Sequence, residues 1–170
     1  MATPMAKNIT PSRTNGPKSL DEYFMKQALV QARRAFNKEE VPIGAVIEYK
    51  GRVFSKAYNQ RIKKNSALAH AEMLAIEKAC KKLGDWRLED MTLYVTCEPC
   101  LMCAGAIIHS RIKRLVYGCS EPKMGAIKSQ YRVFNNKNSH HKVILKAGVL
   151  ENDCKSILKE FFKNLRSLRK

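Results

Sequence analysis

The first periodic segment of the chain predicts a helix. Ser19-Leu20-Asp21-Glu22 has the form of a capping box, in which a serine begins a helix and a glutamate follows three residues later. The apolar positions behind it fall on one helical face over about five turns, and they are Met25, Ala28, Leu29, Ala32 and Phe36.

The middle of the chain alternates between segments typical of strands and segments typical of helices. Residues 41–49 and 53–59 predict a β-hairpin around Lys50-Gly51. Ser66 is a candidate cap for a second helix over 67–83, and Gly84 is a candidate stop signal for it. Residues 91–97, MTLYVTC, are rich in β-forming side chains and predict a further strand.

The last part of the chain repeats this alternation. Pro99 suits the first position of a third helix over 99–110, and RLVYGC at 114–119 predicts another strand. Residues 142–150 predict a closing strand, and residues 151–170 predict a long final helix. Strands that alternate with helices indicate an α/β fold. We therefore expect three α-β-α layers around a central mixed five-stranded sheet.

Length and composition predict the domain organisation. The 170 residues suit one domain over 20–170. Residues 1–19 are polar and basic, which indicates a disordered tail, with a transit peptide as the alternative. The sequence lacks a stretch of about 20 apolar residues, so we expect no membrane partner. Its six cysteines do not suggest a disulfide scaffold, and we expect a reducing, cytoplasmic location.

The charge of the chain points to a polyanionic partner. Lys and Arg number 32 against 15 acids, which gives a formal net charge of +17. The excess is concentrated, since residues 49–71 contain basic side chains and no acid. A lysine-rich solvated surface would explain a modest excess. An excess of this size favours binding to nucleic acid, because released counterions contribute to affinity.

The stretch CEPCLMC contains three cysteines, and two of them suit metal binding. Cys100 and Cys103 are three residues apart at the start of a predicted helix, so both sulfurs lie on one side. His70 and Glu72 lie near the start of the preceding helix. If the strand 91–97 lies between these helices, both helix starts meet at one end of the sheet, where open α/β sheets bind ligands.

One histidine and two cysteines are the ligands of a catalytic zinc site, which leaves a fourth position for water. Zinc lowers the pKa of that water towards about 7. Glu72 is then placed to take its proton and pass it to a leaving group. His-x-Glu followed by Pro-Cys-x-x-Cys is the signature of zinc-dependent nucleobase deaminases. Either half alone is weak evidence, whereas the combination is specific.

Other uses of the cysteines remain open from the residues alone. An iron–sulfur cluster needs a fourth cysteine nearby, and the next one is Cys119. A closed structural zinc would recruit Cys97, and a redox dithiol would use Cys100 and Cys103 alone. Cys97 ends a strand before the helix begins, so we expect it to be a small apolar filler of the core.

The sequence resembles the bacterial tRNA adenosine deaminase family over roughly residues 20 to 168. The motifs that carry the resemblance occur in the family's order, and they are 41–47, Asn59, 69–76, 86–118, 122–126 and Phe161-Phe162-Lys163. The resemblance implies the cytidine deaminase-like fold. It also implies hydrolytic conversion of adenosine to inosine at the wobble position of a tRNA anticodon, by a homodimer that binds the anticodon stem–loop.

The resemblance also assigns expected roles to individual residues. It implies that Zn²⁺ is held by His70, Cys100 and Cys103, and that Glu72 is the proton shuttle. It further implies a set of substrate contacts. Asn59 would hydrogen-bond the flipped purine, and Ala71 would offer its backbone amide. The other expected contacts are Val41, Pro42 and Ile43 in the wall of the base pocket, Lys123 at a phosphate, and Phe162 near the anticodon.

Three departures from the family pattern bear on RNA affinity more than on chemistry. Ser66-Ala67-Leu68 stands where the family has Asp-Pro-Thr, Lys128 replaces a glycine, and Lys163 replaces an arginine. Two alternative functions remain. One is a guanine, cytosine or nucleotide deaminase of the same fold, and the other is a non-catalytic, zinc-stabilised RNA-binding module.

Overall fold

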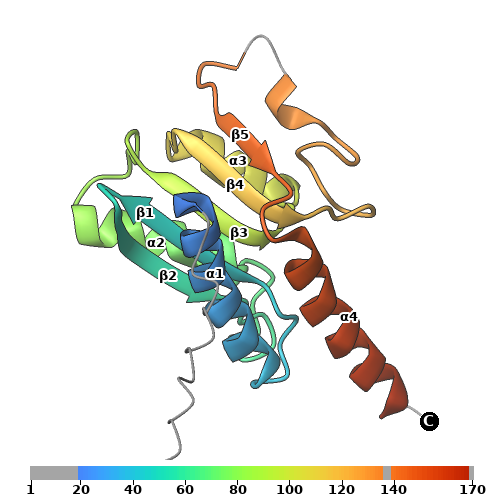
Figure 1. Cartoon of the computed structure of the whole chain (residues 1–170). Helices are drawn as coiled ribbons and strands as arrows, with labels where there is room; N and C mark the ends of the chain where they lie inside the picture. Colours follow the sequence, from blue (N-terminus) through green and yellow to red (C-terminus); the bar gives the residue numbers. More distant parts are fainter. Residues whose placement is uncertain (1–18, 136–138, 169–170) are drawn as a thin grey trace, which may run out of the picture.

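The predicted order of helices and strands is confirmed by the structure, a computed structural model that describes residues 19–135 and 139–168 (Figure 1). Of the predicted tail at 1–19, residues 1–18 lie outside the described residues. The elements are α1 (Leu20–Phe36), β1 (Gly44–Tyr49), β2 (Arg52–Tyr58), α2 (Ala71–Leu83), β3 (Thr92–Cys97), α3 (Leu101–His109), β4 (Arg114–Cys119), η1 (Val133–Asn135), β5 (Ile144–Ala147) and α4 (Glu151–Ser167).

The five strands form one mixed sheet in the order β2-β1-β3-β4-β5. β1 is antiparallel to both of its neighbours, while β3 is parallel to β4 and β4 is parallel to β5. β2 therefore also runs parallel to β3. The carboxyl ends of β2, β3, β4 and β5 consequently lie at one edge of the sheet, together with the amino end of β1.

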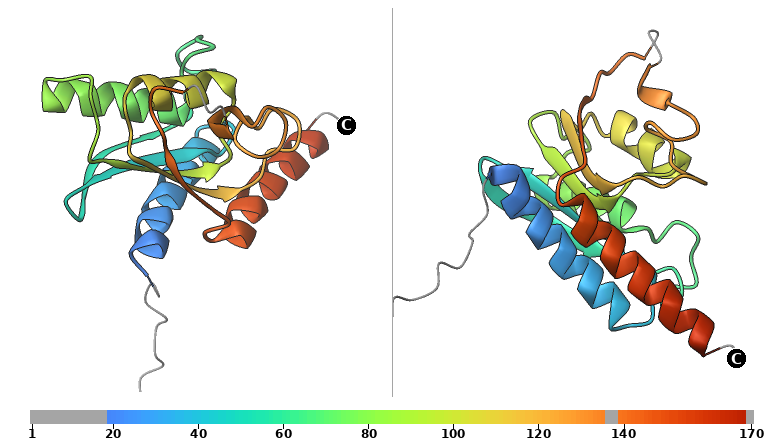
Figure 2. Two further views of the ribbon diagram at one scale, coloured as in Figure 1. Left: turned by 90° about the horizontal axis from the view of Figure 1, so that it is seen from above. Right: turned by 45° about the vertical axis from the view of Figure 1, so that its right-hand side comes forward.

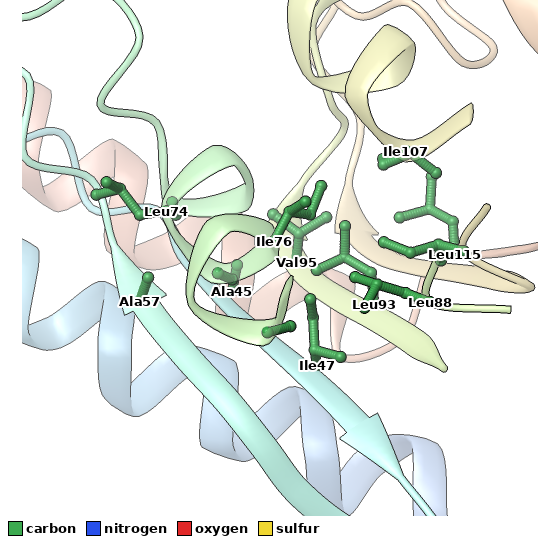
Figure 3. Close-up of a cluster of buried hydrophobic side chains, with 14 of the residues drawn as sticks. Ala45, Ile47, Ala57, Leu74, Ile76, Leu88, Leu93, Val95, Ile107 and Leu115 are labelled. Carbon is green, nitrogen blue, oxygen red and sulfur yellow. The ribbon is translucent and has the colours of Figure 1, made fainter. Parts of the chain in front are cut away.

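The sheet is covered on both faces, which confirms the three-layer prediction. Figure 2 shows α2 and α3 on one face of the sheet and α1 and α4 on the other. The larger apolar cluster lies under α2 and α3 and includes Ile47, Leu93, Val95 and Leu115 (Figure 3). A second cluster on the opposite face contains side chains from α1 and α4. The strands alternate between these clusters because successive side chains point to opposite faces.

Close packing of α1 on the sheet depends on a glycine. A Cβ atom at Gly44 would lie 2.0 Å from the carbonyl oxygen of Ala28 and 2.4 Å from the amide nitrogen of Ala32. Both are backbone atoms of α1, so they could not move aside without displacing the helix. Gly44 therefore allows α1 to contact the backbone of β1 directly.

Two helix starts differ from the prediction. Ser66 does not cap α2; its hydroxyl accepts a hydrogen bond from the Leu68 amide at 3.3 Å in a turn, and the helix begins at Ala71 with His70 as N-cap. Pro99 is not the first residue of α3, which begins at Leu101 with Cys100 as N-cap. His70 and Cys100 both have extended backbone angles, so neither helix extends further toward the N-terminus.

The first predicted cap is confirmed, since the Ser19 hydroxyl accepts a hydrogen bond from the Glu22 amide at 3.2 Å. Gly84 ends α2 with φ of 75°, the left-handed conformation that glycine adopts without strain. Among the described residues, we find no helix that combines the length and the apolar character needed to cross a bilayer.

Candidate active site

The three expected metal ligands lie together at the edge where the parallel strands end. His70 precedes α2, Cys100 precedes α3, and Cys103 lies in the first turn of α3. The Nδ1 atom of His70 lies 3.7 Å from the Cys100 sulfur and 3.6 Å from the Cys103 sulfur. One donor atom from each residue can be chosen so that all lie within 4.8 Å of one another. The predicted convergence of the two helix starts is therefore confirmed.

The electrostatics of this cluster favour a cation. Hydrogen bonding from Cys103, helped by His70, lowers the pKa of Cys100 to about 3 against the opposing effect of burial. The hydrogen bond to Cys100 raises the pKa of His70, and the negative charge of Glu72 acts in the same direction. The pKa of Cys103 is raised, first by its hydrogen bond with Cys100 and then by burial. Metal binding requires the deprotonated form of each of these side chains, so a bound cation would displace any protons that they carry.

Glu72 lies in the first turn of α2, two residues beyond His70, and is buried. Burial raises the pKa of its carboxyl group, because the charged form loses its solvation. Its interaction with Cys103 is close enough to raise the pKa of that thiol. A buried carboxyl group with a raised pKa beside a metal-ligand cluster is suited to take up and return a proton.

Asn59 follows the end of β2 and has a buried oxygen that is not hydrogen-bonded to the described protein. Its Nδ2 atom donates a hydrogen bond to the Val41 carbonyl at 3.3 Å. Its Oδ1 atom is buried and accepts no hydrogen bond from the described residues. The residue is only 4% exposed. Buried polar atoms are nearly always hydrogen-bonded in native proteins, so this acceptor is suited to an N–H group of a ligand.

Asn59 also lines a hollow of about 540 Å³. The hollow is lined by Glu40, Val41, Asn59, Arg61, Ile62, Asn65, Ser66 and Ala67. Its volume is within the usual range for small-molecule sites. Arg61 is near enough to the cluster for its positive charge to oppose the raised pKa of His70.

The other expected wall residues occupy different positions. Val41 lines the hollow, whereas Pro42 is buried and Ile43 packs against both apolar clusters. Ile43 supports the site through its backbone, because its carbonyl accepts the Asn59 amide at 3.0 Å. Ala71 is buried as the first residue of α2, where backbone amides have no partner inside the helix.

Lys123 and Phe162 line a second hollow, of about 550 Å³, between the loop after β4 and helix α4. Leu158, Lys159 and Arg166 line it as well. Phe162 is 40% exposed, while the neighbouring Phe161 is buried against Phe36. The two phenylalanines therefore differ in role, and Phe162 is the one that a ligand can reach.

Cys97 lies apart from the ligand cluster, as the sequence predicted. It is buried in the apolar cluster on the α1 and α4 face, near Cys119 on the neighbouring strand. Hydrogen bonding with Cys119 and burial raise the pKa of its thiol. Cys97 is thus a neutral thiol in the core, and Cys154 is buried in the same cluster.

Two buried carboxylates beside the site were not identified from the sequence. Glu40 accepts the amides of Ile62 and Lys63 at 3.2 and 2.8 Å, and thereby holds the loop that lines the first hollow. Glu98 accepts hydrogen bonds from the loop after β4. Burial acts to raise the pKa of Glu98, but hydrogen bonds from Ser129, Lys128 and Glu121 outweigh it and lower that pKa. The only sequence signal for Glu98 was an acid next to a metal-ligand motif.

Comparison with known proteins supports the chemistry that this geometry suggests. The family model for MafB19-like deaminases matches residues 19–166. The tRNA-specific adenosine deaminase of Bacillus subtilis is 45% identical over 150 residues, which are 88% of this chain and 93% of that protein.

Solved structures agree with this result. A structure from a study of A-to-I editing by tRNA deaminases at the wobble position superposes with a TM-score of 0.78 at 46% identity, covering 80% of this chain and 99% of that one. A guanine deaminase from Bacillus subtilis has a TM-score of 0.56 at 42% identity and covers only 58% of this chain and 64% of its own. The chain belongs to the MafB19-like deaminase family and, within it, to the tRNA-specific adenosine deaminases.

Proposed function

We propose that this protein hydrolyses adenosine to inosine at the wobble position of a tRNA anticodon, with release of ammonia. The observation that carries the proposal is the convergence of His70, Cys100 and Cys103 beside buried Glu72. It is joined by Asn59, which has an unsatisfied buried oxygen and lines a hollow. The similarity to tRNA-specific adenosine deaminases supports the choice of substrate.

The donor set fits zinc. One imidazole nitrogen and two sulfurs match the borderline-soft preference of this ion, and three protein ligands are typical of catalytic zinc sites. We therefore propose that His70, Cys100 and Cys103 hold Zn²⁺. When bound there, the ion would supply the Lewis acidity that makes a water molecule nucleophilic at neutral pH.

The protein's own groups orient the base and move the protons. The Asn59 oxygen accepts a hydrogen bond from a purine N–H, and the Ala71 amide donates to the base from the start of α2. Val41 contacts the base at the wall of the hollow, and Pro42 and Ile43 support that wall from behind. Glu72 takes a proton from the attacking water and delivers it to the departing amino group. Because Glu72 is buried, bulk water does not compete for this transfer.

RNA binding is proposed for the charged surface around the second hollow. Lys123, Lys159 and Arg166 surround exposed Phe162 there, so one site offers both phosphate-binding cations and an aromatic ring. Single-stranded RNA is bound by this combination, in which bases stack on rings and phosphates pair with cations. We propose that the anticodon stem–loop crosses this surface, with Lys123 at a phosphate.

We also propose a homodimer, which the family resemblance implied. Two large apolar side chains within two residues of the proposed metal ligands, Leu68 and Leu101, are 61% and 45% exposed and are suited to an interface. The tRNA substrate supports a cytoplasmic location, and a single sheet with one covering helix layer on each face supports a single domain over 20–170.

The decisive experiment incubates the protein with total tRNA from a strain that lacks wobble inosine and then maps inosine by sequencing. We expect inosine at the first anticodon position and none with Glu72→Ala. In parallel, free guanine, cytosine and deoxycytidylate are assayed for ammonia release. Ammonia from a free base without inosine in tRNA would favour the alternative deaminase. RNA binding without either product would favour the non-catalytic module.

A further inference from the structure

The carboxylate of Glu98 is surrounded by donors from one loop. Its Oε1 atom accepts the amides of Ile127, Lys128 and Ser129 at 3.1, 2.7 and 2.9 Å. Its Oε2 atom accepts the amide of Glu121 at 3.1 Å and the hydroxyl of Ser129. The residue is only 4% exposed. Four backbone amides and one hydroxyl of the 121–129 segment thus converge on a single buried side chain.

The segment is shaped around this carboxylate. A Cβ atom at Gly125 would lie 2.5 Å from both the Cδ and Oε2 atoms of Glu98, and 2.4 Å from the Glu121 carbonyl oxygen. Only glycine therefore allows the backbone to pass so close. The Ala126 amide also donates to the Pro99 carbonyl at 2.8 Å, which attaches the loop to the turn that carries Cys100.

Glu98 connects two parts of the proposed site. It lies between the end of β3 at Cys97 and the metal-ligand candidate Cys100. The loop that it holds carries Lys123, which lines the second hollow opposite Phe162. A displacement of this loop would change the surface proposed for RNA, whereas the side chains of the metal cluster lie outside the loop.

We propose that Glu98 is a positioning residue that fixes the 121–129 loop in the conformation that binds RNA, an inference that rests on the proposed function. A loop that is already ordered loses less conformational entropy when the substrate binds. Glutamine cannot replace this carboxylate, because its amide has one acceptor oxygen and its NH₂ group would face donors.

The first test needs no enzymatic activity. Glu98→Gln should increase amide hydrogen exchange at residues 121 and 127–129 by at least about tenfold, the loss expected for one charge-assisted hydrogen bond. Exchange in α2 should stay unchanged. Glu77→Gln, which neutralises an exposed acid on α2 paired with Lys81, is the matched control and should leave the loop unchanged. Unchanged loop exchange in Glu98→Gln would overturn the proposal.

The second test measures the consequence for substrate. With an anticodon stem–loop, Glu98→Gln should raise KM by about tenfold, while kcat changes by less than about threefold and zinc content stays that of the wild type. A fall in kcat or zinc with unchanged KM would show a structural role at the metal cluster and overturn the proposal.

Two further variants keep the test decisive if Glu98→Gln does not fold. Ser129→Ala removes one donor and leaves the four amides, so it should raise KM by a smaller factor of about threefold. Gly125→Ala places a methyl group against the carboxylate and should increase loop exchange as well. If wild-type protein forms no inosine, the proposed function fails, and hydrogen exchange with the measured RNA affinity of each variant still decides the role of Glu98.

Discussion

At the scale of single residues, the backbone around each cysteine determines its chemistry. Cys97 ends β3, and its side chain packs in the cluster on the α1 and α4 face of the sheet. Cys100 is the N-cap residue of α3, where unpaired amides and the helix dipole favour a thiolate, and Cys103 lies in the first turn. Cys97 and Cys100 are three residues apart, but the end of β3 lies between them, so they belong to different sites. Cys100 and Cys103 are also three residues apart, but both lie at the start of α3, so they belong to one site.

The three cysteines give the first prediction. Cys97→Ala should keep zinc and activity and should lower the free energy of unfolding by about 1 kcal/mol, because a small buried group is removed. Cys100→Ala and Cys103→Ala should each lose zinc and turnover, because two ligands hold the ion poorly. Metal analysis of the purified variants measures this. A zinc-free Cys97→Ala protein would indicate a closed structural site instead.

Glu72 gives the second prediction, because its position separates proton transfer from metal binding. Glu72→Ala should retain metal and RNA affinity, while kcat falls by at least about a hundredfold, the usual contribution of a general acid–base group. Single-turnover assays and metal analysis of the same sample measure both properties. Loss of the metal, or activity near that of the wild type, would assign Glu72 a different role.

The sequence predicted the residues of the metal cluster, but it did not predict that Glu40 and Glu98 hold loops through hydrogen bonds. Cys100 and Cys103 are only three residues apart, and the combined motif of His-x-Glu and Pro-Cys-x-x-Cys linked them to His70 although that residue lies 30 positions before Cys100. The acceptors Glu40 and Glu98 bind amides that lie more than twenty residues away. Nothing in the local pattern around Glu40 distinguishes it from a solvated acid, and the one signal for Glu98 is its position next to a metal-ligand motif. The structure explains why a lysine can replace the family's glycine at position 128. Its backbone amide donates to Glu98, while its side chain is exposed.

At the scale of elements, strands and helix ends were predicted better than helix starts. Gly84 stops α2 through its own backbone preference, so the signal is local. Ser66 and Pro99 have the residue types of helix starts, but the chain between them and each helix holds His70 and Cys100 in extended conformations. Local helix propensity cannot predict these starts, because the extended conformations of His70 and Cys100 depend on contacts between residues far apart in the sequence.

A buried ion cluster joins several elements at the opposite edge of the sheet. Asp21 in α1 accepts hydrogen bonds from Arg114 at 2.7 and 2.9 Å, from Lys146 at 2.6 Å and from the Tyr94 hydroxyl at 2.9 Å. The bond from Arg114, with help from Lys146 and Tyr94, holds the pKa of Asp21 well below its usual range against the effect of burial.

This cluster gives the third prediction. Asp21→Asn should lower the free energy of unfolding at pH 7 by about 2 to 3 kcal/mol. This loss is smaller than that for breaking a fully buried ion pair, because Lys146 is half exposed. Since folding lowers the pKa of Asp21, its stabilisation is present above the ordinary pKa near 4 and is lost as pH falls through the folded value. The difference between the two proteins should therefore shrink below about pH 4.

Denaturant unfolding at several pH values measures this dependence. Asp85→Asn, which alters an exposed pair with Arg87, is the control and should change stability little at any pH. A difference for Asp21→Asn that is constant or larger at low pH would show that the cluster does not stabilise the fold through its charge.

At the scale of the whole molecule, the direction of the strands brings the residues of the proposed site together. Asn59 follows β2, Cys100 follows β3, and Lys123 follows β4, and these three strands are parallel. Their carboxyl ends meet at one edge, so residues from distant parts of the chain become neighbours. The alternation of strands and helices predicted this edge, whereas the shape of the two hollows depends on loops whose conformation the sequence pattern does not specify.

The net charge of +17 gives the last prediction, because phosphate contacts make affinity depend on salt. The logarithm of the association constant for an anticodon stem–loop should fall with the logarithm of salt concentration, by about 0.7 for each phosphate neutralised on a single strand. If RNA crosses the second hollow, Lys123→Ala and Arg166→Ala should each reduce this slope by about 0.7. Lys81→Ala, at the far end of α2, is the matched control and should leave it unchanged. A reduced slope in the control alone would place the RNA on the opposite edge of the sheet, and a flat response in the wild type would favour a small free-base substrate.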